Sequence, residues 1–196
     1  MSKISTITRP SKTRQVIGVI PARWGSTRLP GKSLLPLCGK PLIQWVIERA
    51  RLAKNLGSLL VATDDPRIQA ASEKAGCRAV LTSPAHPSGT DRIAEAIKDS
   101  TADVVLNIQG DEPLIDPKLI DRLAREMTAD TQWDMATVAT PLDNENDLNS
   151  RSVTKVVWDR EGRALYFSRA PIPCLRDPAK GKPSGLVWYR HIGLYA

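Results

Sequence analysis

A loop over residues 21–33 combines glycine with cationic side chains in a way that suits phosphate binding. Gly25 and Gly31 lie within it, and its three cations are Arg23, Arg28 and Lys32. Backbone N–H groups beside glycines can approach a phosphate closely, while Arg and Lys neutralise its charge. Five residues separate the two glycines, whereas a P-loop requires four, so the segment falls short of that motif. We predict a local anion site; the alternative is a surface loop with solvated charges.

An acidic segment, residues 109–113, directly follows an apolar run and contains Asp111. A carboxylate at the end of a strand can hold Mg²⁺, which prefers hard oxygen ligands and keeps several waters. Such an ion would bridge phosphates. The alternative is a turn in which the aspartate caps a local backbone group.

Two further segments carry candidate residues. In the first, residues 86–92, the helix that follows can be capped by Ser88, Thr90 or Asp91. Arg92 stands in the first helical turn, against the preference of the helix dipole. We expect Arg92 to face an anion or a carboxylate. In the second, residues 166–173, Arg169 could bind a carboxylate in fork geometry, or form a structural ion pair. His191 stands in an apolar run, which is more typical of a core histidine than of a catalyst.

The elements that would position these residues alternate between short apolar strands and helices. The expected strands span 16–20, 58–62, 78–81, 103–108 and 135–139, and the expected helices span 41–54, 66–75, 89–98 and 117–127. This alternation predicts an α/β fold with an open, mostly parallel sheet flanked by helices. In such sheets ligands bind beyond the carboxyl ends of the strands, which is where residues 21–33, 82–92 and 109–113 fall.

The pattern changes after Thr140. Residues 153–158 and 163–167 read as a hairpin, 168–186 as a long loop, and 187–196 as a strand. We therefore expect a polar, disordered basic lead over 1–14 and one domain over 15–196, with a β-rich subregion over about 141–190. Because the chain stops inside an apolar strand, we expect the domain to be C-terminally incomplete or completed otherwise.

Composition narrows the classes of function. The net charge of +7 resides in the first 47 residues, which hold eight basic and no acidic side chains; the other 20 basic residues face 21 acidic ones. This favours a local anion site over a nucleic-acid-binding face, and the scattered tryptophans form no stacking stripe. No apolar run approaches the roughly 18 residues of a membrane span. Three cysteines outside any CxxC pattern favour a reducing, cytoplasmic setting.

Several motifs, in this order, resemble those of the 3-deoxy-manno-octulosonate (Kdo) cytidylyltransferases, the CMP-Kdo synthetases of lipopolysaccharide synthesis. They are IPAR (20–23), LPGK (29–32), HPSGTDR (86–92), QGDEP (109–113), ALYFSRAPIP (164–173) and RHIGLYA (190–196). The resemblance implies a Rossmann-like nucleotidyltransferase fold that turns CTP and Kdo into CMP-Kdo and pyrophosphate, with Mg²⁺ as cofactor. It also implies a homodimer in which the β-rich part contributes to association.

The resemblance also assigns residues. Arg23, Lys32 and Asp111 would be catalytic, with Asp111 as the metal ligand. The CTP site would comprise Ala22, Arg23, Ser26, Thr27, Arg28, Lys32, Ser88, Gly89, Arg92 and Gln109. The Kdo site would comprise Gln109, Arg169, His191 and Tyr195, with Arg169 on the sugar carboxylate.

The chain departs from the family pattern at three points. Trp24-Gly25 replaces a Tyr-Ala pair, which we expect to leave phosphate binding intact, and Thr154 begins a VKVV-type segment that keeps its lysine, Lys155. The family also continues beyond HIGLYA into a segment that supplies a second metal-binding carboxylate, and the lack of that carboxylate here keeps a homologue without turnover among the alternatives. The alternatives are a homologue that binds nucleotide or sugar without turnover, a cytidylyltransferase for a related acidic sugar such as an amino-Kdo analogue, and a P-loop-like NTPase.

Overall fold

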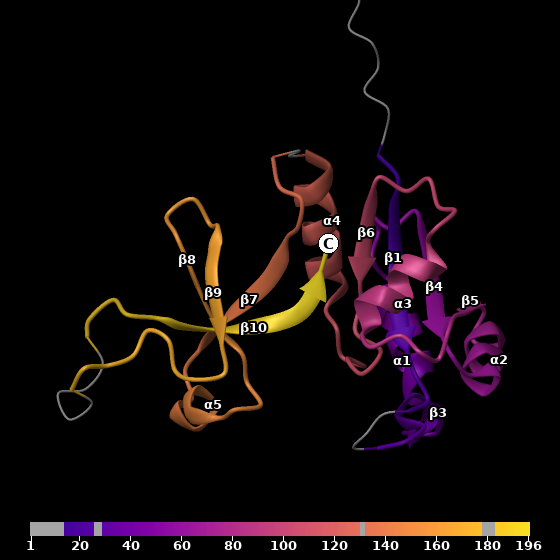
Figure 1. Ribbon diagram of the computed structural model, residues 1–196, viewed down its shortest axis with the longest axis horizontal. Coiled ribbons are helices and arrows are strands. Elements are labelled where there is room, and N and C mark those ends of the chain that lie inside the picture. Colours follow the sequence, from indigo (N-terminus) through magenta and orange to yellow (C-terminus); the bar gives the residue numbers. More distant parts are fainter. Residues whose placement is uncertain (1–13, 26–28, 130–131, 178–182) are drawn as a thin grey trace, which may run out of the picture.

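A computed structural model describes residues 14–25, 29–129, 132–177 and 183–196. The expected disordered lead, apart from its last residue, lies outside the described residues, and so do Ser26, Thr27 and Arg28. Figure 1 shows two lobes. The described residues from 14 to 129 build one around a parallel sheet, and the strands after residue 136 build the other.

The parallel sheet places the candidate segments along one edge. Its strands are β1 (Val16–Ala22), β4 (Ser58–Thr63), β5 (Arg78–Leu81) and β6 (Val104–Asn107), in the order β5-β4-β1-β6. All three pairings are parallel, and β1 in the centre is almost wholly buried. The predicted α/β sheet is thus confirmed, and the carboxyl ends of these strands share one edge.

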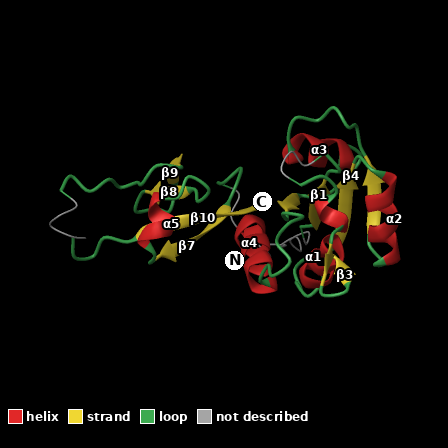
Figure 2. Ribbon diagram, turned by 90° about the horizontal axis from the view of Figure 1, so that it is seen from below, coloured by secondary structure: helices red, strands yellow, loops and turns green. Residues whose placement is uncertain are grey.

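Helices cover both faces of this sheet. On one face lie α1 (Leu42–Ala50), α2 (Pro66–Lys74) and α4 (Pro117–Ala129), which share the larger apolar core with β1, β4 and β6. On the other face α3 (Gly89–Ala96) packs through Ile93 on Val19 and its neighbours. Figure 2 shows the sheet between these layers.

Side-chain caps set where two of these helices begin. The Asp65 carboxylate accepts a hydrogen bond from the Arg67 N–H at the start of α2, and the Ser88 hydroxyl accepts one from the Asp91 N–H at the start of α3. The helix expected over 41–54 runs four residues beyond the end of α1. Helix α1 ends at Ala50 because the N–H groups of residues 54 and 55 instead donate to the Asp121 carboxylate.

The second lobe is antiparallel. It contains β7 (Thr137–Leu142), α5 (Glu145–Asn149), β8 (Lys155–Trp158), β9 (Ala164–Ser168) and β10 (Trp188–Tyr195). The expected hairpin is confirmed as β8–β9. The strand expected over 135–139 as part of the parallel series is wrong in position and pairing. It is β7, which pairs antiparallel with β10, because β10 takes the place beside β6 through Tyr195 and Asn107.

Sequence patterns missed one small feature next to the candidate loop. A 3-10 helix (Lys32–Leu34) leads into a two-stranded turn, β2 (Pro36–Leu37) and β3 (Lys40–Pro41). No described helix is long and apolar enough to cross a membrane.

Candidate functional site

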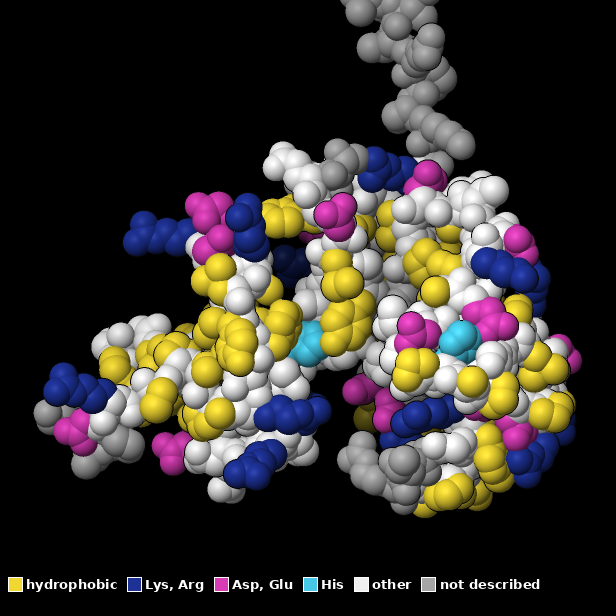
Figure 3. Space-filling model, in the orientation of Figure 1, with side chains coloured by type: hydrophobic (Ala, Val, Ile, Leu, Met, Phe, Trp, Pro, Cys, Tyr) yellow, Lys and Arg dark blue, Asp and Glu magenta, His cyan; other side chains and the backbone are white. Residues whose placement is uncertain are grey.

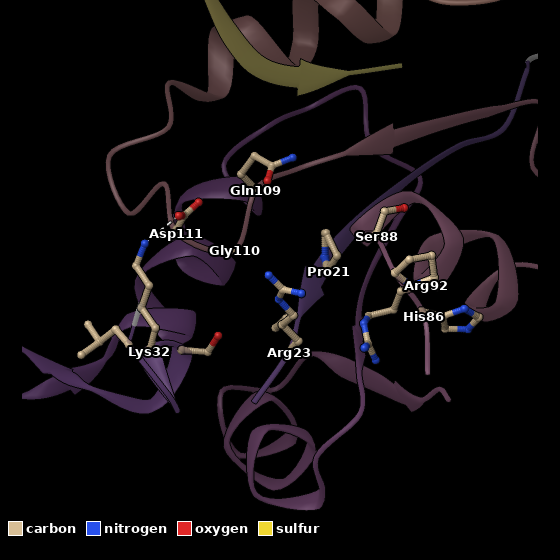
Figure 4. Close-up of a pocket in the computed structure, with 14 residues that line it drawn as sticks. Pro21, Arg23, Lys32, His86, Ser88, Arg92, Gln109, Gly110 and Asp111 are labelled. Carbon is tan, nitrogen blue, oxygen red and sulfur yellow. Dashed lines mark hydrogen bonds and ion pairs between the residues drawn. The ribbon is translucent and has the colours of Figure 1, made fainter. Parts of the chain in front are cut away.

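A pocket of about 720 Å³ opens at the carboxyl ends of β1 and β6 and the start of α3. It brings together the three segments that the sequence singled out, as Figure 4 shows. The predicted residues that line it are Ala22, Arg23, Lys32, Ser88, Gly89, Arg92, Gln109 and Asp111.

Two glycines allow these segments to close on β1. A Cβ atom on Gly110 would lie 2.8 Å from the carbonyl oxygen of Pro21, and one on Gly89 would lie 3.3 Å from the Pro21 ring. The first distance is too short for any side chain. Gly110 therefore sets how closely the acidic segment approaches β1, and so the position of Asp111.

Lys32 and Asp111 face each other across the pocket. The ammonium nitrogen lies 2.6 Å from Oδ2 of the carboxylate, and the two side chains keep 39% and 50% of their surface exposed. Such an exposed pair contributes little to stability. Both groups are therefore available to a charged ligand, the lysine to phosphate oxygens and the aspartate to a cation.

Arg23 points into the same space. In Figure 4 its guanidinium lies between the Lys32–Asp111 pair on one side and Ser88 and Arg92 on the other. Arg23 and Lys32 thus bring two accessible cations to a pocket that Asp111 lines with a carboxylate, which is a setting for a polyanion.

Arg92 faces a carboxylate, as its place in the helix indicated. Its side chain is 3% exposed, and it donates to Oδ2 of Asp64 over 3.0 Å and to the Thr82 hydroxyl over 2.5 Å. These contacts join the ends of β4 and β5. Sequence analysis missed Asp64, although a signal was present: two aspartates precede α2, and its cap requires only one.

The loop before α3 is fixed by hydrogen bonds among its own residues. The Ser88 hydroxyl donates to the Asp91 carboxylate over 2.5 Å as well as capping the helix. The His86 ring bonds to Glu95, which also accepts from the N–H of Ser83. These two bonds, the backbone one more strongly, hold the pKa of Glu95 below its usual range.

The predicted sugar-side residues Arg169, His191 and Tyr195 do not line the pocket; they belong to the second lobe. The Arg169 guanidinium donates to the carbonyl of Arg151 over 2.7 Å, and its own carbonyl accepts from the buried ammonium of Lys155 over 2.6 Å. Arg169 is thus held by backbone groups and stays exposed.

His191 lies between aromatic rings. Its ring contacts those of Phe167 and Tyr195 at 4.9 and 5.2 Å between centroids, and it hydrogen-bonds to the Thr137 hydroxyl. Burial lowers the pKa of His191 and raises that of Tyr195, so both are neutral near pH 7.

One contact links the two groups of residues. A Cβ atom on Gly193 of β10 would lie 3.2 Å from Cγ of Gln109, so the Gln109 side chain lies directly against β10. His191 and Tyr195 stand two residues to either side of that point. Gln109 therefore joins the pocket to the second lobe.

Comparison with known proteins identifies the family. Residues 17–196 match the family model described as cytidylyltransferase. A 3-deoxy-manno-octulosonate cytidylyltransferase of Bdellovibrio bacteriovorus is 50% identical over 182 residues, covering 93% of this chain and 73% of that relative. One of Anaeromyxobacter sp. is 51% identical over 185 residues, covering 93% and 72%. This chain belongs to the 3-deoxy-manno-octulosonate cytidylyltransferase family.

Solved structures agree with this family. The structure of CMP:2-keto-3-deoxy-manno-octonic acid synthetase complexed with CTP is 41% identical and has a TM-score of 0.84, covering 92% of this chain and 73% of that one. A cytidylyltransferase of Leptospira borgpetersenii is 28% identical with a TM-score of 0.58, covering 63% and 53%. The family and the nucleotidyltransferase fold that the motifs implied are confirmed.

Proposed function

We propose that this chain activates Kdo with CTP, giving CMP-Kdo and pyrophosphate for lipopolysaccharide synthesis. The observation that carries the proposal is the identity of about half the residues with proteins named for this reaction, over more than nine-tenths of the chain. The synthetase structure that is similar over 92% of this chain and 73% of its own was solved in complex with CTP.

The reaction transfers a cytidylyl group. The anomeric hydroxyl oxygen of Kdo attacks the α-phosphorus of CTP and loses its proton, the new P–O bond forms, and the bond from that phosphorus to the leaving pyrophosphate breaks. Charge neutralisation and alignment lower the barrier to such a step more than covalent chemistry does. Arg23 and Lys32 are the cations placed to neutralise the triphosphate. Ser88, Gly89 and Gln109 line the same pocket.

Mg²⁺ is the cofactor that we propose, with Asp111 as its protein ligand. The described residues contain no cluster of three or more acidic, histidine or cysteine side chains. Mg²⁺ does not need one, since it is commonly held by one or two carboxylates together with substrate phosphates and water. The half-exposed Asp111 carboxylate, bonded to Lys32 through Oδ2, fits that mode. The ion would neutralise phosphate charge beside Lys32.

We assign the sugar to the side of the pocket that faces the second lobe. Gln109 lies against β10, the strand that carries His191 and Tyr195, so the pocket and these residues share one edge of the structure. Two neutral side chains can bond to sugar hydroxyls, and the exposed Arg169 guanidinium can take the carboxylate. Burial lowers the pKa of His191, and we assign its neutral ring a hydrogen bond to the sugar.

We further propose a homodimer built through β9. This edge strand exposes Leu165, Tyr166 and Phe167 at 62%, 64% and 40%. Hydrophobic side chains gather over this lobe in Figure 3. A flat apolar edge strand is a template for association, and a contiguous apolar patch commonly marks an interface.

The three cysteines are free, which fits a reducing compartment, and we place the protein in the cytoplasm.

Product analysis tests the proposed function. The protein is incubated with Mg²⁺, Kdo and each of CTP, UTP, GTP and ATP, and then with CTP and N-acetylneuraminate in place of Kdo, and products are identified by mass spectrometry. We expect CMP-Kdo from CTP and Kdo in large excess over every other product. A CMP-sugar formed faster from N-acetylneuraminate would contradict the assigned substrate.

A further inference from the structure

Trp24 is held from three directions at the start of the phosphate-facing loop. Its backbone N–H donates to Oδ1 of Asp64 over 2.9 Å, and its backbone carbonyl accepts from the N–H of Gly31 over 2.9 Å. The guanidinium carbon of Arg67 lies 3.4 Å from the centroid of the indole ring. The ends of β1 and β4 and the first turn of α2 thus meet at Trp24.

Gly31 is shaped to fit against this tryptophan. It has a left-handed φ of 67°, and a Cβ atom there would lie 2.8 Å from the indole ring. Glycine is therefore required both by the backbone conformation and by the close approach of the ring. The two ends of the loop, at Trp24 and Gly31, are clasped together.

The groups that hold Trp24 are themselves fixed. Arg67 makes a two-pronged bond to Asp65, with distances of 2.9 and 2.6 Å, and this pairing lowers the pKa of Asp65 and raises that of Arg67. Asp64 is held by the buried Arg92. The clasp therefore rests on the body of the parallel sheet and on α2.

We propose that Trp24 is a positioning residue that sets the spacing of the two cations facing the triphosphate. Arg23 directly precedes Trp24, and Lys32 directly follows Gly31. Closing the loop between Trp24 and Gly31 fixes the distance between these cations before any ligand arrives. Arg67, which does not line the pocket, thereby controls nucleotide affinity. The inference rests on the proposed function, since it assigns the pocket to CTP.

Substitutions at Trp24 and Arg67 test the inference through the dissociation constant for CTP and the separate KM values for CTP and Kdo. Trp24→Leu removes the ring, and we expect CTP affinity to fall about tenfold or more, whereas Trp24→Tyr keeps an aromatic face and should restore most of it. Arg67→Ala removes one side of the clasp at an exposed position and should weaken CTP about three- to fivefold, the range of an exposed cation–π contact. The KM for Kdo should not change in any of these three variants.

The matched control is Arg163→Ala, which removes a guanidinium that stacks on Trp133 with 5.6 Å to the ring centroid and lies outside the pocket. This variant should bind CTP as the wild type does. Wild-type protein that binds no CTP would overturn the proposed function itself. Wild-type protein that binds CTP while Arg67→Ala and Trp24→Leu bind it equally well would overturn the inference alone. If Trp24→Leu does not fold, the Arg67→Ala result decides.

Discussion

At the scale of single residues, the two ion pairs at the site, Arg92–Asp64 and Lys32–Asp111, differ in how much of their side chains solvent can reach. Arg92 and Asp64 are almost fully buried, and each has its partner within the fold, so they serve the architecture. Lys32 and Asp111 are about half exposed, and they form an ion pair in the lining of an open pocket. The charges to which we assign catalytic roles are therefore those that the fold leaves accessible to solvent.

Asp111→Ala should abolish magnesium-dependent turnover and leave the fold intact. The half-exposed carboxylate contributes less than about 1 kcal/mol through its bond to Lys32, so the free energy of unfolding should hardly change. The measurement is the rate of pyrophosphate release beside a thermal unfolding curve. Retained activity would remove Asp111 from the metal site, and Glu112→Ala, next to it in sequence, serves as the control.

Arg169→Ala should raise the KM for Kdo roughly tenfold or more and leave the KM for CTP unchanged, because a bond to a charged group contributes about 1.5–3 kcal/mol. Steady-state kinetics with each substrate varied in turn measure this. The neighbouring Arg151→Ala is the control, since Arg151 meets Arg169 through its carbonyl oxygen, which the substitution keeps. An unchanged KM for Kdo would leave Arg169 with a structural role only.

At the scale of elements, local patterns predicted what local interactions decide. The cap at Asp65, the proline after it and the glycine at residue 76 bounded α2 correctly, and the hairpin β8–β9 was read from its turn. Partner choice between distant strands was not readable. Nothing in the apolar run before residue 196 says that β10 inserts beside β6 and turns β7 antiparallel.

Gly110→Ala should lower both stability and activity. The added Cβ would lie 2.8 Å from the backbone oxygen of Pro21, which cannot move aside as a side chain can, so the segment carrying Asp111 must shift. We expect a loss of about 1–3 kcal/mol in the free energy of unfolding, measured by urea titration. Gly25→Ala is the comparison, because no described atom lies within 4 Å of its Cβ position. Equal stability of the two variants would contradict the close approach.

Acid should destabilise β10 through His191. Burial depresses its folded pKa below the ordinary value of 6.5, so the unfolded chain binds the proton more readily. The stability associated with neutral His191 is complete above pH 6.5 and declines as pH falls below that value toward the folded pKa. The pKa of Glu95 is also lowered, so the stability that its ionised carboxylate contributes is lost only below about pH 4.5. Urea titrations from pH 7.5 to 5 should show a shallower decline in His191→Asn, and an identical decline would contradict this account.

At the scale of the whole molecule, the proposed reaction assigns the nucleotide to the pocket of the first lobe and the sugar to the side that faces the second lobe. The sequence predicted that three segments at strand ends lie together, and they do line one pocket, because the carboxyl ends of parallel strands share one edge of a sheet. It placed Arg169, His191 and Tyr195 only by resemblance, since their position depends on how β10 crosses between lobes. Figure 3 shows the hollow that separates the lobes.

A dimer through β9 should show in the mass in solution. The chain has a mass of 21.5 kDa, and light scattering should give twice that value. Tyr166→Glu places a charge on the exposed edge strand and should yield a monomer. Leu52→Glu, at an equally exposed apolar residue on the far lobe, should leave the dimer intact. A monomeric wild type would contradict the proposed interface.

The release of pyrophosphate from CTP and Mg²⁺, with and without Kdo, tests the central claim most directly. The account predicts release that requires Kdo and equals the amount of CMP-Kdo formed. Release at the same rate without Kdo would indicate a nucleotide hydrolase. No release in the presence of both substrates would show a pocket that binds without turnover, and either result would contradict the assigned reaction.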